Sequence, residues 1–126
     1  INWVHDSIAQ NQFFPGTSEP IANLKSTQGH KVRYAGEITV VAGNQHPSVQ
    51  NREIAIYKML VCKSIAAGNQ VVLISSAGVT AGGANNHPSF DFSLVNDQLV
   101  ATPKGITTGG FYFEITTDSQ IIASKV

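Results

Sequence analysis

Two short segments of the sequence contain the same histidine triplet. His-Pro-Ser follows Asn-Gln at residues 44–48 and Asn-Asn at residues 85–89. Histidines are common zinc ligands, and a serine close to a histidine is a candidate nucleophile. The candidate binding residues of the two segments are Asn44, Gln45, His46, Asn85, Asn86 and His87. The repeat indicates either a metal-binding or catalytic site or two places where a loop leads into a strand.

The residues around each triplet favour the second interpretation. Neither histidine has the His-x-His or His-x-x-x-His spacing that brings two imidazoles to one metal ion. Ser48 and Ser89 lie outside any Gly-x-Ser-x-Gly turn of the kind that exposes a catalytic serine. Pro47 and Pro88 suit the beginning of a strand, where a missing N–H is tolerated. We therefore expect no metal, no cofactor and no catalytic residue at the repeat.

The acidic residues and the cysteine give no stronger sign of catalysis. Glu37, Glu53, Asp91 and Glu114 all fall in predicted strands, and the sequence does not indicate that any two face one cleft, as glycoside hydrolysis requires. We expect them to be solvent-facing strand charges. Cys62 lies in an apolar segment, where it is expected to be a small buried hydrophobe. The sequence predicts a protein that is not an enzyme.

The composition of the chain limits the classes of molecule that the protein is expected to bind. The 126 residues are enough for one domain with its own core. Eight Lys and Arg balance eight Asp and Glu, and only 13% of the residues are charged, which argues against binding to nucleic acid. The single cysteine excludes an intrachain disulfide. No apolar run approaches the roughly 20 residues of a membrane helix, so no membrane insertion is expected.

The elements that must position these residues are predicted to be strands. Residues 31–41, 89–95 and 110–117 alternate apolar and polar side chains with the period of two of a half-buried strand. Residues 52–63 have apolar side chains on both parities, which fits a strand covered on both faces or one that changes face at a bulge. A helix is the competing interpretation of residues 52–63. A turn at residues 64–69 leads from them into a further strand at 71–75.

One hairpin can be predicted with its register. Asn96 and Asp97 suit a two-residue turn because both residue types tolerate positive φ. That turn places Leu94 opposite Leu99 and Phe92 opposite Ala101. Apolar residues then meet on one face of the hairpin, so turn chemistry and side-chain parity agree.

These elements predict an all-β protein, an antiparallel and jelly-roll-like β-sandwich of about seven or eight strands. We assign residues 31–126 to the sandwich and residues 1–30 to an N-terminal arm or loop. Trp3, Phe13 and Phe14 in that arm are candidate assembly residues, as a lid on the sandwich or a contact with the next subunit. A sugar-stacking platform is the alternative role for these three aromatic side chains.

The order of elements from about Lys31 to Val126 resembles a module at the ends of tail-fibre and related appendage proteins of tailed bacteriophages. The residues that carry the resemblance are REIAIYKMLVCK, VVLISSAGVT, SFDFSLV, NDQLVATPKG and GGFYFEITT, in that order. The match covers about three quarters of the chain and leaves out the first thirty residues. It is a match of strand pattern and loop spacing.

The resemblance implies a non-enzymatic structural protein of the virion, outside the cell, that associates with other virion proteins and forms a homotrimer. Host attachment through the Asn-rich loops, to a surface glycan or a protein, is a further implication. A second hypothesis is an extracellular filament subunit, pilin-like, in which residues 1–10 are donated to a neighbour's sheet. A third is a carbohydrate-binding module with the same fold.

Overall fold

The computed structural model describes residues 2–8, 18–28, 33–44, 54–80, 83–84, 89–104, 111–118, 120–124 and 126. The strands are β1 (Asn2–Ile8), β2 (Glu19–Ser26), β3 (Tyr34–Asn44), β4 (Ile54–Ser64), β5 (Gly68–Thr80), β6 (Gly83–Ala84), β7 (Ser89–Val95), β8 (Gln98–Lys104), β9 (Phe111–Thr117) and β10 (Ile121–Ser124). None of these described residues forms a helix long and apolar enough to span a membrane.

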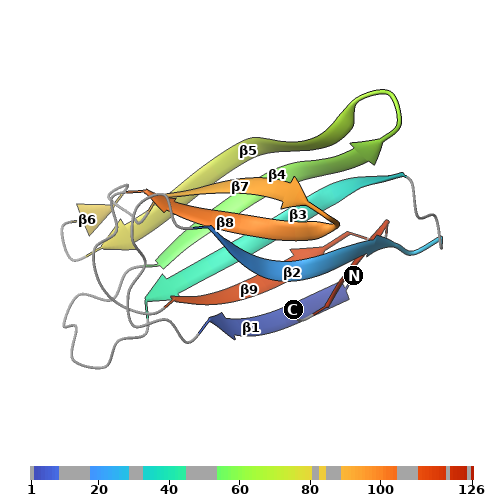
Figure 1. Ribbon diagram of the computed structural model, residues 1–126. Coiled ribbons are helices and arrows are strands. Elements are labelled where there is room, and N and C mark those ends of the chain that lie inside the picture. The colour runs from blue at the N-terminus through green and yellow to red at the C-terminus, as the bar shows by residue number, and fades with distance from the viewer. Residues whose placement is uncertain are drawn as a thin grey trace.

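The strands form two antiparallel sheets that stack face to face (Figure 1). The larger sheet has the order β1-β9-β3-β4-β5-β6, and the smaller sheet has the order β10-β2-β8-β7. Buried apolar side chains from both sheets fill the space between them. The predicted antiparallel β-sandwich is confirmed. Ten strands lie in the described residues, and β1, β2, β6 and β10 were not among the strands that the sequence indicated by residue range.

Strand β3 has the predicted alternation. Tyr34, Ile38 and Val40 are buried against the smaller sheet, while Glu37 and Thr39 point outward and are partly exposed. A strand places successive side chains on opposite faces, so the apolar parity of this segment determines which face is buried.

Residues 54–64 are strand and not helix. Every second residue from Ala55 to Val61 is buried, and the apolar residues of the other parity, Ile54, Ile56 and Leu60, are exposed. The second sheet therefore covers only one face of β4. A register shift does occur here, but Ile74 of β5 is the extra residue, since Lys58 pairs with Ser75 and Met59 pairs with Leu73.

The β7–β8 hairpin has the predicted turn and register. Asn96 and Asp97 have φ values of 50° and 60°, as a two-residue turn with both residues in the left-handed region requires. Phe92 pairs with Ala101, and Leu94 pairs with Leu99. Leu94, Leu99 and Ala101 are buried, and Phe92 lies partly buried against the core.

The segment at residues 19–26 lies inside the sandwich, whereas the sequence assigned it to an N-terminal arm. It forms β2, which is paired with β10 on one side and β8 on the other. Ile21, Ala22 and Leu24 belong to the hydrophobic core. The division at residue 30 therefore falls between two strands of the same fold. The segment from Asn2 to Ile8 pairs with β9 along the edge of the larger sheet.

Candidate functional site

Most residues of the histidine segments lie outside the described part of the chain. This holds for Gln45, His46, Asn85, Asn86 and His87, and also for Phe13, Phe14, Ser48 and Glu53. Asn44 ends β3, where its backbone pairs with Phe111, and Trp3 lies in β1 opposite Thr116. The roles predicted for all these residues stay predictions.

The strands that flank the two histidine segments end close together. Gly43 pairs with Ile54, and Ile54 pairs with Val79, so the three residues form one row across β3, β4 and β5. Both segments therefore leave the larger sheet at the same end.

The predicted strand carboxylates are distributed over opposite faces of the molecule. Glu37 points outward from the larger sheet, and its Oε1 lies 3.0 Å from Lys58 Nζ. Asp91 points outward from the smaller sheet, and its Oδ1 lies 3.2 Å from Lys104 Nζ. Glu114 is exposed on β9. Among the described residues, no three His, Cys, Asp or Glu side chains are grouped closely enough to hold a metal ion.

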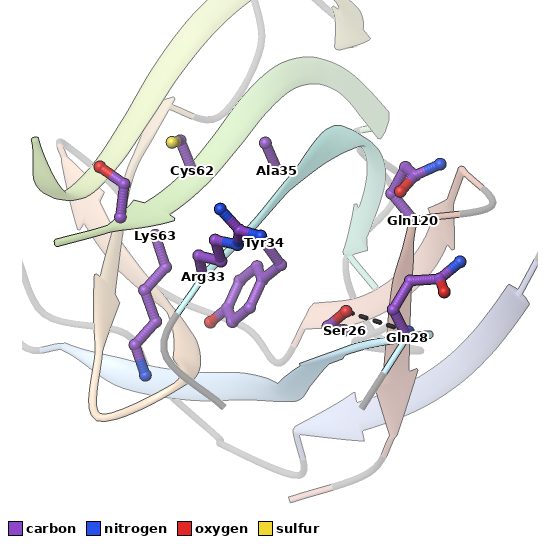
Figure 2. A pocket seen from close by; sticks show the side chains of 9 residues that line it. Ser26, Gln28, Arg33, Tyr34, Ala35, Cys62, Lys63 and Gln120 are labelled. Atoms are coloured by element: carbon purple, nitrogen blue, oxygen red, sulfur yellow. Dashed lines mark hydrogen bonds between the residues drawn. The ribbon is translucent and has the colours of Figure 1, made fainter. Parts of the chain in front are cut away.

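A pocket of about 340 Å³ lies at the other end of the sandwich, where the side chains around it come from four segments (Figure 2). Its described lining residues are Ser26, Gln28, Arg33, Tyr34, Ala35, Cys62, Lys63, Ser64 and Gln120. They belong to the end of β2 and its turn, the start of β3, the end of β4 and the turn before β10. Cys62, predicted to be buried, is instead half-buried at this pocket.

A charged network forms one wall of the pocket. Lys63 Nζ donates to Asp97 Oδ1 at 2.6 Å, and the Tyr34 hydroxyl donates to the same oxygen at 2.9 Å. The network joins β3 and β4 of the larger sheet to the β7–β8 turn of the smaller one. Lys63 Nζ also lies 5.9 Å from the centre of the Tyr34 ring. These contacts hold Tyr34 and Lys63 in place beside the pocket.

The network changes the proton affinity of its members. The hydrogen bond from Lys63 is the largest cause and lowers the pKa of Asp97. Burial, the second cause, raises this pKa, and the hydrogen bond from Tyr34, a smaller cause, lowers it. Burial is the main cause that raises the pKa of Tyr34, and the hydrogen bond to Asp97 adds to it. At neutral pH, Asp97 is therefore a carboxylate, and Tyr34 is a neutral donor.

We expect Asp97→Asn to lower the stability of the protein at neutral pH but not in acid. A lowered pKa in the folded state contributes stability above the unfolded pKa of about 4, and this contribution is lost as pH falls through the folded pKa. Because Asp97 is nearly half exposed, the loss should not exceed about 1 kcal/mol. Asn tolerates the positive φ of this turn. Melting temperatures of both proteins between pH 7 and about pH 2 test this, and a difference that persisted at the lowest pH would contradict it.

Sequence reasoning did not find this pocket. Arg33 and Lys63 are basic residues at one end of two predicted strands, which was the available signal. Their meeting depends on the register of β3 with β4, in which Tyr34 pairs with Lys63. No turn signal fixed that register, because the segment between β3 and β4 is long.

The outer face of the larger sheet is the second notable surface. Its exposed apolar side chains include Ile54 (51% exposed), Ile56 (49%), Leu60 (42%) and Val72 (52%). Ile56 pairs with Val41 on β3 and with Ala77 on β5, and Leu60 pairs with Val72 on β5. The row of Thr39, Lys58 and Ser75 lies between these two rows on the same face. We call the group of Val41, Ile54, Ile56, Leu60, Val72 and Ala77 the apolar face. Soluble monomers rarely expose large contiguous apolar patches.

The outer face of the smaller sheet has a different character. Its outward side chains are mostly polar and include Asn23, Lys25, Asp91, Ser93, Gln98, Thr102, Lys104 and Ser124. One sheet thus has the apolar-in and polar-out pattern of an antiparallel sheet that faces water. The larger sheet lacks this pattern over β4 and β5, where apolar side chains also point outward.

The sequence matches no family model and no curated protein. Its fold, however, occurs in solved structures of phage tailspike proteins. The chain is therefore a β-sandwich module of the kind found in phage tail appendages, as the order of its strands predicted.

One such structure is the tailspike protein of the Acinetobacter phage vB_ApiP_P1, with 31% sequence identity and a TM-score of 0.77 over 98% of the chain. Another is the tailspike protein of the Acinetobacter baumannii phage AM24, with 10% identity and a TM-score of 0.51 over 98% of the chain, a likeness in fold alone. The chain spans 22% of the first tailspike and 28% of the second.

Proposed function

We propose that the chain is a non-catalytic domain of a phage tail appendage, outside the cell, that assembles as a homotrimer through its apolar face. The observation that carries the proposal is the exposure of Ile54, Ile56, Leu60 and Val72 on the larger sheet, whereas the outer face of the smaller sheet is mostly polar. The likeness to a segment of a tailspike supports the virion setting.

A second copy of the same chain is the occupant that fits this face. Glu37 and Lys58, which lie among its rows, neutralise each other with Oε1 and Nζ 3.0 Å apart. Glu114 pairs with Val41 at the β9 side, so the charges that an identical face meets are one ion pair and a carboxylate at the border. The formal net charge of the whole chain is zero, so long-range repulsion between copies is small. The number three follows from the resemblance of the strand order to tail-fibre modules, which assemble around a fibre axis.

The non-catalytic part of the proposal is supported by the placement of the strand carboxylates. Glu37 and Asp91 point away from each other on opposite faces, and each has a lysine partner. Host attachment through residues 43–51 and 75–88 remains part of the proposal, although the sequence indicated loops there and residues 43–44, 75–80 and 83–84 belong to β3, β5 and β6. It follows from the composition of those segments, which are rich in amide and hydroxyl groups.

We expect the 126-residue chain to have the mass of a closed trimer in solution. Light scattering coupled to size-exclusion chromatography measures this mass across a range of concentrations. A monomer at all concentrations would contradict self-association. A broad series of polymers would contradict the closed trimer and favour a filament built by strand donation, in which deletion of residues 1–10 should abolish the polymers.

A further inference from the structure

Strand β5 extends beyond the smaller sheet and leaves one side of the sandwich open. Tyr57 of β4 packs against Phe92 of β7, with ring centres 5.0 Å apart, so the last strand of the smaller sheet lies over β4. β5 is the next strand of the larger sheet and the upper long strand in Figure 1. Leu73 of β5 pairs with the buried Met59, which places the Leu73 side chain on the inner face of the larger sheet. Leu73 is nevertheless 52% exposed, because the smaller sheet does not cover it.

The surface along this side is apolar and uncharged. The group that we call the open side consists of Val71, Leu73, Ile74 and Phe92. Ile74 is the extra residue of the β5 bulge and is 54% exposed. Val71 and Phe92 are partly buried against the core, and β5 and β7 contact each other across the layer. Residues 64–90 contain no Asp, Glu, Lys or Arg, so β5 contributes no charge to the open side.

The free edge of β5 lacks most of the protection that edge strands usually have. In the described part of the chain, one edge of β5 pairs with β4, and the other pairs with β6 only at Val79 and Thr80. Edge strands of soluble proteins are typically short or have Lys, Pro or inward-pointing charges that prevent association. β5 has the bulge at Ile74, but it is 13 residues long and contains neither proline nor charge. Such an edge favours association with another chain.

The proposed trimer requires a partner surface for the apolar face. Around a threefold axis, each contact joins two different surfaces of neighbouring copies and is repeated until the ring closes. The open side adjoins the apolar face, because Val72 on the outer face and Leu73 on the inner face are successive residues of β5. A neighbouring copy that covers the edge of β5 therefore removes exposed apolar side chains of both faces from water.

We propose that the apolar face of one copy packs against the open side of the next, so that the trimer is a ring of head-to-tail contacts around β5. This inference rests on the proposed function and names the second surface of the same assembly. The two surfaces are matched in charge. The open side is uncharged, and Glu37 and Lys58, among the rows of the apolar face, are already paired with each other.

Thiol cross-linking between two kinds of chain tests this pairing of surfaces. In a Cys62→Ser background, which removes the single natural cysteine, one chain has Ile56→Cys and the other has Leu73→Cys. The two chains are co-expressed with different tags and treated with a short bismaleimide. We expect cross-linked dimers that contain one chain of each kind, and no cross-links when either chain is produced alone. Ser93→Cys, on the outer face of the smaller sheet, should give no cross-link when it replaces Leu73→Cys.

The outcomes distinguish failure of this inference from failure of the proposed function. Light scattering on the same samples gives the mass of the particles. Cross-links between Ile56→Cys chains in a particle of trimer mass would show that identical faces meet at the axis, which overturns the head-to-tail contact and leaves the trimer. Absence of cross-links in such a particle would overturn the contact as well. A monomeric parent chain would instead contradict the trimer itself.

Two charge substitutions test the open side without cross-linking. Leu73→Asp should weaken association roughly 30-fold or more, the loss typical of a central interface contact. Val95→Asp is the matched control, because Val95 is 48% exposed on the outer face of the smaller sheet and should lie outside the contact. Equal weakening by both variants would contradict the proposal. A Leu73→Asp chain that remained fully trimeric, with an unchanged strand signal, would contradict it too.

Discussion

Phe113→Ala is expected to lower the free energy of unfolding by about 3–5 kcal/mol, the cost of removing a buried aromatic ring. Phe113 is fully buried on β9, which lies between β1 and β3 in the larger sheet. Its ring packs edge to face against Phe90 of the smaller sheet, with centres 5.3 Å apart. The substitution leaves a cavity in the layer that joins the two sheets. Urea denaturation followed by circular dichroism measures the loss.

Two further variants, which we expect to destabilise the protein less, test which face of β7 is buried. Phe92→Ala should cost less than Phe113→Ala, because Phe92 is only partly buried, although its ring lies 5.0 Å from that of Tyr57. Asp91→Ala, next to it on the exposed face, should change stability by less than about 0.5 kcal/mol. Equal losses in Phe92→Ala and Asp91→Ala would show that the faces of β7 are inverted.

The sequence predicted those parts of the fold that depend on neighbouring residues. Alternation determined the buried face of β3, and the pair Asn96 and Asp97 determined both the turn and the register of the β7–β8 hairpin. In each case the signal lies within a few residues of the feature it predicts. Turn chemistry and parity must agree for a hairpin to form, which makes their agreement informative.

Local sequence patterns did not predict the contacts between segments that are far apart in the chain. The hydrogen bond from Lys63 to Asp97 joins residues 34 positions apart, and the bond from Tyr34 to Asp97 joins residues 63 apart. Both require that the turn at Asp97 lie over the end of the β3–β4 pair. That placement follows from how the two sheets stack. Strand β2 was missed for a related reason, since Pro20 and the mixed polarity of residues 19–26 resemble a loop.

The exposed apolar residues of β4 show a second limit of prediction from sequence. Apolar residues on both parities correctly indicated a strand, and they favoured one covered on both faces or one that changes face at a bulge. The pattern does not distinguish cover by a second sheet of the same chain from cover by another copy. In the single chain only one face is covered, so the remaining apolar side chains become evidence about assembly.

Ile56→Asp is expected to dissociate the proposed trimer. Ile56 lies within the apolar face, 49% exposed, between Val41 and Ala77 in its row. In the assembled protein the new carboxylate would be removed from water without a cation to pair with it, and symmetry would repeat this cost in every copy. A central apolar contact of an interface typically contributes enough that its loss weakens association roughly 30-fold or more. Light scattering across a dilution series measures the shift toward monomer.

The matched control places the same new charge on the opposite side of the sandwich. Ser93 is exposed on the outer face of the smaller sheet, so Ser93→Asp should leave the trimer intact. Because both positions are exposed in the single chain, both variants should keep the strand signal and nearly the melting behaviour of the folded monomer. If Ile56→Asp remained trimeric and Ser93→Asp dissociated, the association surface would lie on the smaller sheet. If both remained trimeric, neither outer face would carry the assembly, and the edge strands β1 and β6 would be the surfaces to change next.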